Sequence, residues 1–220
     1  MRFIFHGAAG EVGRSCIEID DRSSDTRVLL DAGIKIHEHG IEHPTNIDDI
    51  DQVQGIFLSH AHLDHTGSLP LFDHLGMKSP IFCTHITKNI SKILLDDSLH
   101  VQLLKQKHAA YSEFDIDDAL KRMKLVNYRQ PGRYKNIRYE FFDAGHIPGS
   151  ASIVLEIDGK KILYTGDFNT RKTRLLEGAD KSYNNIDVMI TEATYGDEDH
   201  PSRASQEKSF LKDIKNILGQ

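Results

Sequence analysis

Histidine and carboxylate side chains are concentrated in one short stretch of the sequence, Ser59-His60-Ala61-His62-Leu63-Asp64-His65-Thr66-Gly67. Neutral imidazole and carboxylate are the groups with which proteins hold Zn²⁺ for catalysis. In an extended turn His60 and His62 project to the same side, because side-chain direction repeats every two residues, so they can share one ion. Asp64 and His65 begin the segment that follows and suit a second ion. The stretch therefore predicts a metal site.

Several other polar residues lie at or just past the end of an apolar, strand-like segment. With His60 they form a set of five: Asp31, His60, His146, Asp167 and Glu192. Loops at the ends of strands in an α/β sheet aim side chains into a shared crevice. We therefore expect these strands to deliver their polar side chains to a common rim.

The histidine-rich stretch and the later strand ends together offer enough groups for two ions. The six candidate ligands are His60, His62, Asp64, His65, His146 and Asp167. The carboxylate of Asp167 could bridge two ions about 3.5–4 Å apart, which hold a hydroxide between them and lower the pKa of bound water to about 7. A metal-free cluster is the alternative, but burying several imidazoles and a carboxylate without a cation would be costly. The residues thus predict a hydrolytic binuclear centre.

The elements that must position these groups are short strands near both ends of the chain. Apolar or alternating segments predict strands at 2–5, 15–19, 27–30, 53–59, 137–142, 153–157 and 161–165. Asp158-Gly159 between the last two predicts a two-residue hairpin. Gly7–Gly13 lacks Gly-x-Gly-x-x-Gly spacing and precedes a strand, so it favours a tight turn near the crevice over a dinucleotide loop.

Helices are predicted at 87–109, 115–123 and 203–218. The first is predicted by apolar residues near 3.6-residue spacing, which are Ile90, Ile93, Leu94, Val101 and Leu104. Asp115 is the expected N-cap of the second helix. The third carries an apolar stripe that needs a covering partner.

Composition places the chain among ordinary globular proteins, with 39% hydrophobic and 27% charged residues. No apolar segment approaches the ~18 residues that a membrane span needs, and Met1–Gly7 has no signal-peptide core. Cys16 and Cys83 are the only cysteines, which indicates a reducing, cytoplasmic setting. The net charge of −6 gives no sign of nucleic-acid binding by itself.

The histidine-rich stretch resembles the His-x-His-x-Asp-His motif of the metallo-β-lactamase superfamily. Asp31, His146 and Asp167 match the other motifs of that superfamily in order and spacing. Residues 144–151 and 192–197 resemble the β-CASP branch, which contains RNA-processing nucleases. The resemblance implies an α/β fold, the αββα sandwich, with metals at one edge between the sheets.

The resemblance also implies roles for the site residues. His60, His62 and His146 would hold one zinc, Asp64 and His65 would help to hold the other, and Asp167 would bridge them. Asp31 would fix the orientation of a ligand, and Glu192 would position a ligand or a protonation partner. A complete site would contain two zinc ions and would hydrolyse phosphodiester bonds in RNA.

Members of this branch continue into a β-CASP domain and then complete the lactamase domain. On that basis residues 1–197 are expected to be the N-terminal portion of a metallo-β-lactamase domain. Residues 198–220 are expected to be a linker and the first helix leading into a β-CASP domain that is absent here. We expect this piece to bind fewer than two zinc ions and to have weak or no activity.

Basic residues near the predicted site favour a phosphate-containing substrate. Arg171, Lys172 and Arg174 follow Asp167 closely, and a basic segment extends from Lys121 to Arg138. A solvated surface is the alternative interpretation of both. RNA is the expected partner, with single-stranded DNA as a second option. The protein is expected to act as a homodimer or in an RNA-processing complex, and no membrane association is expected. The alternatives are a hydrolase of another ester, a thioester or a lactone, and a non-catalytic scaffold subunit.

Overall fold

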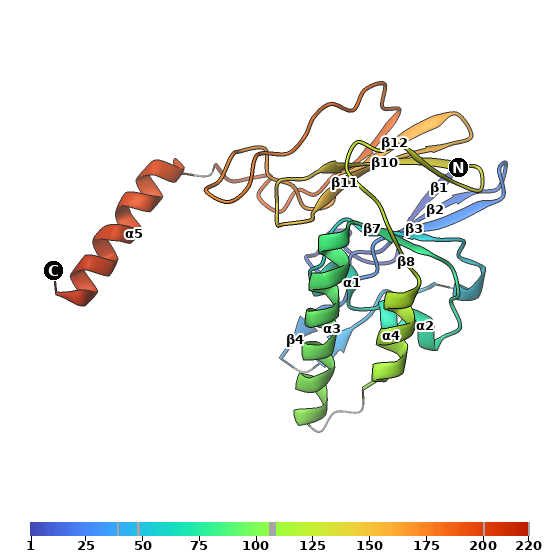
Figure 1. The fold of residues 1–220 in the computed structure, drawn as a ribbon, viewed down its shortest axis with the longest axis horizontal. Coiled ribbons are helices and arrows are strands. Elements are labelled where there is room, and N and C mark those ends of the chain that lie inside the picture. Colours follow the sequence, from blue (N-terminus) through green and yellow to red (C-terminus); the bar gives the residue numbers. More distant parts are fainter. Residues whose placement is uncertain (39, 48, 106–108, 200, 220) are drawn as a thin grey trace.

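Two β-sheets stacked face to face form the body of the protein, and helices cover the outer side of one of them (Figure 1). The computed structural model describes residues 1–38, 40–47, 49–105, 109–199 and 201–219. The predicted α/β class is confirmed. Three layers of the predicted sandwich are present, and within the described residues no helix covers the outer side of the second sheet.

The first sheet has six strands in the order β1-β2-β3-β6-β7-β8. They are β1 (Arg2–Phe5), β2 (Ile17–Asp21), β3 (Thr26–Leu30), β6 (Ile56–Phe57), β7 (Ile81–Cys83) and β8 (Met123–Leu125). From β3 to β8 the strands run parallel, so their carboxyl ends meet at one edge. A separate hairpin of β4 (Lys35–His37) and β5 (Gly40–Glu42) and a 3₁₀ turn at Ile50–Gln52 lie between β3 and β6.

The second sheet has five strands in the order β13-β12-β11-β10-β9. They are β9 (Gly132–Tyr134), β10 (Ile137–Asp143), β11 (Ala151–Ile157), β12 (Lys160–Tyr164) and β13 (Val188–Ile190). The hairpin predicted at Asp158-Gly159 is confirmed, because both residues have positive φ, 48° and 72°, as a type I′ turn requires. In this sheet β13 runs parallel to β12, and the other paired strands run antiparallel.

The helices are α1 (Leu63–Thr66), α2 (Leu69–His74), α3 (His85–Leu104), α4 (Glu113–Lys121) and α5 (Arg203–Leu218). Helices α1 to α4 lie on the first sheet, whereas α5 projects away from the body (Figure 1). No residue of α5 is buried. The helix predicted at 203–218 is therefore confirmed, and its apolar stripe has no partner within the described residues.

Alternation along the strands divides the buried residues into two cores. Leu29 and Ile56 pack with the helices, whereas the next residue of each strand, Leu30 and Phe57, packs against the second sheet. Successive side chains of a strand point to opposite faces, so the central strands β3, β6 and β7 contribute to both cores. These cores hold the strand ends in fixed positions.

Helix α3 buries a different face from the one that its large apolar residues mark. The buried residues are Thr87, Ser91, Leu95, Ser98 and Leu99. Ile93 and Leu104, which help to predict the helix, are 67% and 69% exposed. Small hydroxyl residues let the helix approach its neighbours closely, and Thr84 and Thr87 both donate hydrogen bonds to the Gly149 carbonyl. Residues 106–108 of the helix predicted at 87–109 lie outside the described residues, as do residues 200 and 220 of the segment 198–220.

Helix α4 begins earlier than predicted, so the expected N-cap at Asp115 is wrong. Ser112 is the N-cap, and Asp115 is the third helical residue of a capping box. The Asp115 carboxylate accepts hydrogen bonds from the backbone N–H and the hydroxyl of Ser112, both at 2.7 Å. The helix ends at Lys121, because Met123 begins β8.

Candidate metal centre

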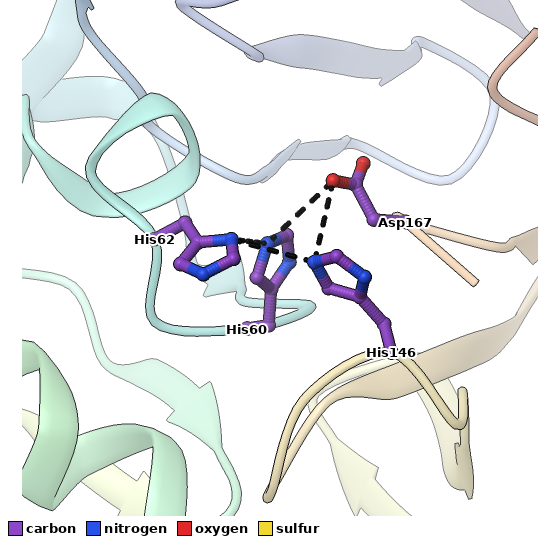
Figure 2. Close-up of side chains that lie close together, drawn as sticks. All are labelled: His60, His62, His146 and Asp167. Carbon is purple, nitrogen blue, oxygen red and sulfur yellow. Dashed lines mark hydrogen bonds and ion pairs between the residues drawn. The ribbon is translucent and has the colours of Figure 1, made fainter. Parts of the chain in front are cut away.

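Residues that follow strands of both sheets converge on one edge of the sandwich. Asp31 follows β3 and His60 follows β6 in the first sheet, while His146 follows β10 and Asp167 follows β12 in the second. Figure 2 shows the side chains of His60, His62, His146 and Asp167 pointing toward one another. The predicted convergence of strand ends is thus present in the structure.

One group of side chains brings its donor atoms within 4.8 Å of one another, and its members are His60, His62, His146 and Asp167. Nε2 of His60 lies 3.1 Å from Nδ1 of His62, which lies 3.4 Å from Nε2 of His146. Oδ2 of Asp167 lies 3.8 Å from His60 Nε2 and 3.6 Å from His146 Nε2. Tetrahedral zinc with bonds of about 2.0–2.1 Å places its ligand atoms roughly 3.3 Å apart, so this group has the chemistry and the spacing to hold an ion.

A second group consists of His60, Asp64 and His65, and its donor atoms also lie within 4.8 Å of one another. Nε2 of His65 lies 3.7 Å from Oδ2 of Asp64 and 3.4 Å from Oδ1 of Asp167. Asp167 therefore turns one oxygen to each group, which is the geometry that a bridging carboxylate needs.

Burial and charge set the protonation of these groups. Burial and the neighbouring His65 push the pKa of His60 well below its usual range, so the His60 ring is neutral and offers a lone pair. Burial raises the pKa of Asp167, but the hydrogen bond and charge of His65 outweigh this effect and hold that pKa well below its usual range. Burial also opposes the charge on His65, yet Asp31 and Asp167 raise the pKa of His65 to about 10.

Asp31 lies beneath the donor groups and is fully buried. Its Oδ1 accepts a hydrogen bond from the Ser59 N–H at 2.7 Å. Its Oδ2 accepts from the Ser59 hydroxyl at 2.7 Å, from Nδ1 of His65 at 2.7 Å and from the Tyr164 hydroxyl at 2.6 Å. Asp31 therefore contacts His65 of the second donor group directly and reaches His60 of the first only through Ser59.

The backbone around Asp64 is held by two loops. The N–H of Ser15 donates to the Asp64 carbonyl, and the N–H of Ala32 donates to the His65 carbonyl, both at 2.8 Å. A Cβ on Gly33 would lie 1.6 Å from the Asp64 carbonyl oxygen, so only glycine permits this approach. The Asp31-Ala32-Gly33 turn thereby supplies both the buried carboxylate and the close contact that fixes α1.

Two hydroxyls at this centre are absent from the sequence-based set of site residues. Ser59 immediately precedes His60, and Tyr164 ends β12 three residues before Asp167. One sequence signal for Tyr164 exists. Tyr164 lies two residues after Ile162 on β12, so its hydroxyl is a polar group on the strand face that packs into the core between the sheets. A hydroxyl is too common at such positions to identify the role without the contact to Asp31.

A cavity of about 480 Å³ opens beside the second donor group. Its lining includes Asp64, His65, Asp167 and Glu192 together with residues of Gly7–Gly13. The turn predicted at Gly7–Gly13 is thus present and lies at the crevice. Oε1 of Glu192 accepts a hydrogen bond at 3.2 Å from the N–H of Phe168, next to Asp167.

The basic residues near Asp167 are largely neutralised by acids. Arg174 makes a two-pronged contact with Glu207 of α5, at 3.1 and 2.7 Å, and Lys172 pairs with Glu177. Arg171 is exposed, and no ion pair of its side chain is present within the described residues. In the 121–138 segment Arg122 pairs with buried Asp73, and Arg129 pairs with Asp180. These pairs favour the solvated-surface interpretation over a continuous phosphate-binding face.

Comparison with known proteins identifies the family. Residues 17–194 match the metallo-beta-lactamase superfamily domain. The chain belongs to the metallo-β-lactamase superfamily. A solved structure, a protein of unknown function from Enterococcus faecalis V583, superposes with a TM-score of 0.52 over 76% of this chain and 43% of that chain, at 19% identity. That likeness concerns the fold alone.

The curated relatives place this superfamily member in the β-CASP branch, as predicted. It is 45% identical to a "Probable RNase MJ4" and 38% identical to an "RNase J-like protein", both from Methanocaldococcus jannaschii, over 99% and 97% of its length. It is 34% identical to "Cleavage and polyadenylation specificity factor 73" from Drosophila melanogaster over 97% of its length. It covers 51%, 48% and 31% of these relatives, so the chain spans about half the length of the archaeal ones.

Within the described residues no helix is long and apolar enough to cross a membrane.

Proposed function

We propose that this chain carries the metal centre of a zinc-dependent hydrolase that cleaves phosphodiester bonds in RNA. The observation that carries the proposal is the pair of donor groups at the strand ends, which share His60 and which Asp167 links through its contact with His65. All six predicted ligands belong to these groups. A non-catalytic scaffold subunit would not need to keep them, so the donor set argues against that alternative.

Zinc fits the donor set, because imidazole nitrogens and carboxylate oxygens are its usual ligands at catalytic sites. His60, His62, His146 and Asp167 would hold one ion, and Asp64, His65 and Asp167 would hold the other. When bound, such ions lower the pKa of coordinated water to about 7 and bear the charge that develops on the attacked phosphate.

The remaining residues would keep this centre in shape. Asp31 orients His65 through a hydrogen bond of 2.7 Å. Glu192 holds the N–H of Phe168 and thereby the turn that carries Asp167. The loops around Ser15 and Gly33 hold the α1 backbone, and with it Asp64 and His65. We therefore assign positioning roles to Asp31 and Glu192, both of which were predicted as site residues.

The substrate class rests on the relatives, whose names describe RNases and a cleavage and polyadenylation factor. The cavity itself has an acidic wall. Glu11, Asp64, Asp167 and Glu192 line it, and no Lys or Arg does so among the described residues. Attraction of a phosphate to this cavity would therefore depend on bound metal, and substrate affinity should fall when the metal is removed.

Cleavage of end-labelled RNA by the intact protein tests the proposal. We expect cleavage with zinc, loss of cleavage after treatment with a chelator, and loss in His62→Ala. His100→Ala, an exposed histidine of α3, is the matched control and should cleave normally. Hydrolysis of a lactone or a thioester without cleavage of RNA would overturn the substrate assignment, and full activity of His62→Ala would overturn the metal centre.

A further inference from the structure

We propose that Ser59 is a positioning residue that fixes the tautomer of His60, so that Nε2 of His60 is free to bind metal. Through Asp31 the same hydroxyl joins His60 to His65, and thus one donor group to the other. The inference rests on the metal centre of the proposed function, but it concerns hydrogen bonds of the chain itself.

The Ser59 hydroxyl lies among three polar partners in the interior, where Ser59 is 1% exposed. Its Oγ is 2.7 Å from Oδ2 of Asp31 and 3.0 Å from Nδ1 of His60. Nδ1 of His65 lies further away, at 3.4 Å. The Ser59 N–H also donates to Oδ1 of Asp31, so both polar groups of this residue contact the same carboxylate.

Proton counting then determines the direction of each hydrogen bond. A hydroxyl has one proton to donate, and an ionised carboxylate can only accept. The contact between Ser59 and Asp31 therefore uses the hydroxyl proton. Oγ is left as an acceptor, so Nδ1 of His60 must carry the proton in the contact between them. In a neutral ring Nε2 is then unprotonated, and it is Nε2 that faces His62 and Asp167.

Asp31 extends this arrangement to the second donor group and to the second sheet. It accepts from Nδ1 of His65, which turns Nε2 of His65 toward Asp64 and Asp167. Tyr164 of β12 donates its hydroxyl to the same oxygen and is itself 3.1 Å from the Ser15 hydroxyl. One buried carboxylate thus orients ligands of both groups, one of them directly and the other through Ser59.

Histidine-selective ¹⁵N NMR on the metal-free intact protein reads the His60 tautomer directly. We expect the Nδ1–H form for His60 in the wild-type protein. The Nε2–H form would overturn the inference without any variant, so the test does not depend on a substitution that folds. In Ser59→Ala we expect loss of the Nδ1–H preference.

Two further variants separate positioning from a general loosening of the interior. Ser152→Ala removes an equally buried hydroxyl, which donates to the Thr165 carbonyl at 3.0 Å and contacts no candidate ligand. Tyr164→Phe removes a donor to Asp31 but keeps Ser59. Both should retain the wild-type His60 tautomer. A change in either variant equal to that in Ser59→Ala would overturn the inference.

Zinc affinity, measured by competition with a chelator, completes the test. We expect Ser59→Ala to bind the first zinc about 10–100-fold more weakly than wild type, the range typical of lost ligand-orienting hydrogen bonds. Ser152→Ala should bind as wild type does. Unchanged affinity in Ser59→Ala would overturn the inference even if RNA is cleaved. The expected tautomer and affinities without any RNA cleavage would instead overturn the proposed substrate and leave the role of Ser59 in place.

Discussion

Asp31 combines two properties that rarely occur together in one residue. It is fully buried, and its φ of 60° lies in the left-handed region, which a non-glycine residue seldom adopts. The turn that imposes this φ also brings the carboxylate under Ser59, His65 and Tyr164. The same turn thus sets both the backbone conformation of Asp31 and the position of its carboxylate.

Asp31→Asn should destabilise the metal-free protein by about 3–5 kcal/mol, as removal of one partner from a buried charged pair does. Asparagine tolerates the left-handed region, so the loss reports the carboxylate and not the turn. Urea unfolding measures the change in the free energy of unfolding. Asp25→Asn is the control, because Asp25 is exposed and has φ of 49°. Equal effects of the two substitutions would contradict the assigned role of Asp31.

The histidine-rich stretch was predictable because its ligand types are dense and local. Ser59 and Tyr164 were not, because their importance depends on a contact with Asp31 that spans 133 residues in the case of Tyr164. The position of Arg174 near Asp167 predicted a contact with phosphate, and this remains a prediction. In the structure its guanidinium is bound by Glu207, a residue of α5.

Single elements followed the sequence pattern where one face is plainly apolar. The β11–β12 hairpin formed at the predicted residues, because Asp158-Gly159 supplies the positive φ values of its turn. Helix α3 was found but its buried face was not. The buried face contains small hydroxyl residues such as Ser91 and Ser98, which allow close packing. Hydrophobic periodicity does not detect such a face, because these residues are not apolar.

Glu18 of β2 ties three neighbouring strands together through buried charge. Its Oε2 lies 3.1 Å from Nε2 of His6, which follows β1, and its carboxylate pairs with Arg27 of β3. Burial raises the pKa of Glu18, but the hydrogen bonds from His6 and Arg27 outweigh this and lower it from 4.5 to about 2. The pairing therefore stabilises the edge of the first sheet only while Glu18 is ionised.

The pH dependence of stability should follow from that shift. Because the folded pKa is below the unfolded one, the contribution of Glu18 is full above about pH 4.5 and is lost as pH falls toward about 2. Glu18→Gln should therefore unfold at a lower urea concentration than wild type at neutral pH. The difference between the two unfolding midpoints should shrink as the pH falls from about 4.5 to about 2. Exposed Glu177→Gln serves as the control and should track wild type. A gap independent of pH would contradict the assignment.

At the scale of the whole molecule, the metal centre is a seam between the two sheets. His60 follows β6 of the first sheet and Asp64 lies in α1, whereas His146 and Asp167 follow β10 and β12 of the second sheet. The longer strands and the helices α3, α4 and α5 could be predicted from the sequence, because each has its own pattern. Short elements such as β4, β5, β8 and β9 were not predicted. The position of α5 away from the body could not be predicted from the sequence. Its stripe of apolar residues predicts that a partner covers it but does not indicate where that partner lies.

Metal binding across the seam should stabilise the fold. A ligand that binds only the native state adds RT ln(1 + [L]/Kd), or about 2.7 kcal/mol at a free zinc concentration one hundred times Kd. Urea unfolding with and without zinc measures this gain, and chelation should reverse it. Asp167→Ala should abolish most of the gain, because Asp167 serves both donor groups. A zinc effect of equal size in Asp167→Ala would contradict a site at the seam.

The Ser15–Tyr164 and Asp31–Tyr164 hydrogen bonds join residues 149 and 133 positions apart. Contacts of such sequence separation form only after long loops have closed, and proteins rich in them fold slowly. We therefore expect the ligand-orienting network to assemble late, after each sheet has formed. A chain in which the sheets have not yet docked would present zinc with the histidines of one loop, at lower affinity. Capture of metal at full affinity would then mark the completion of folding.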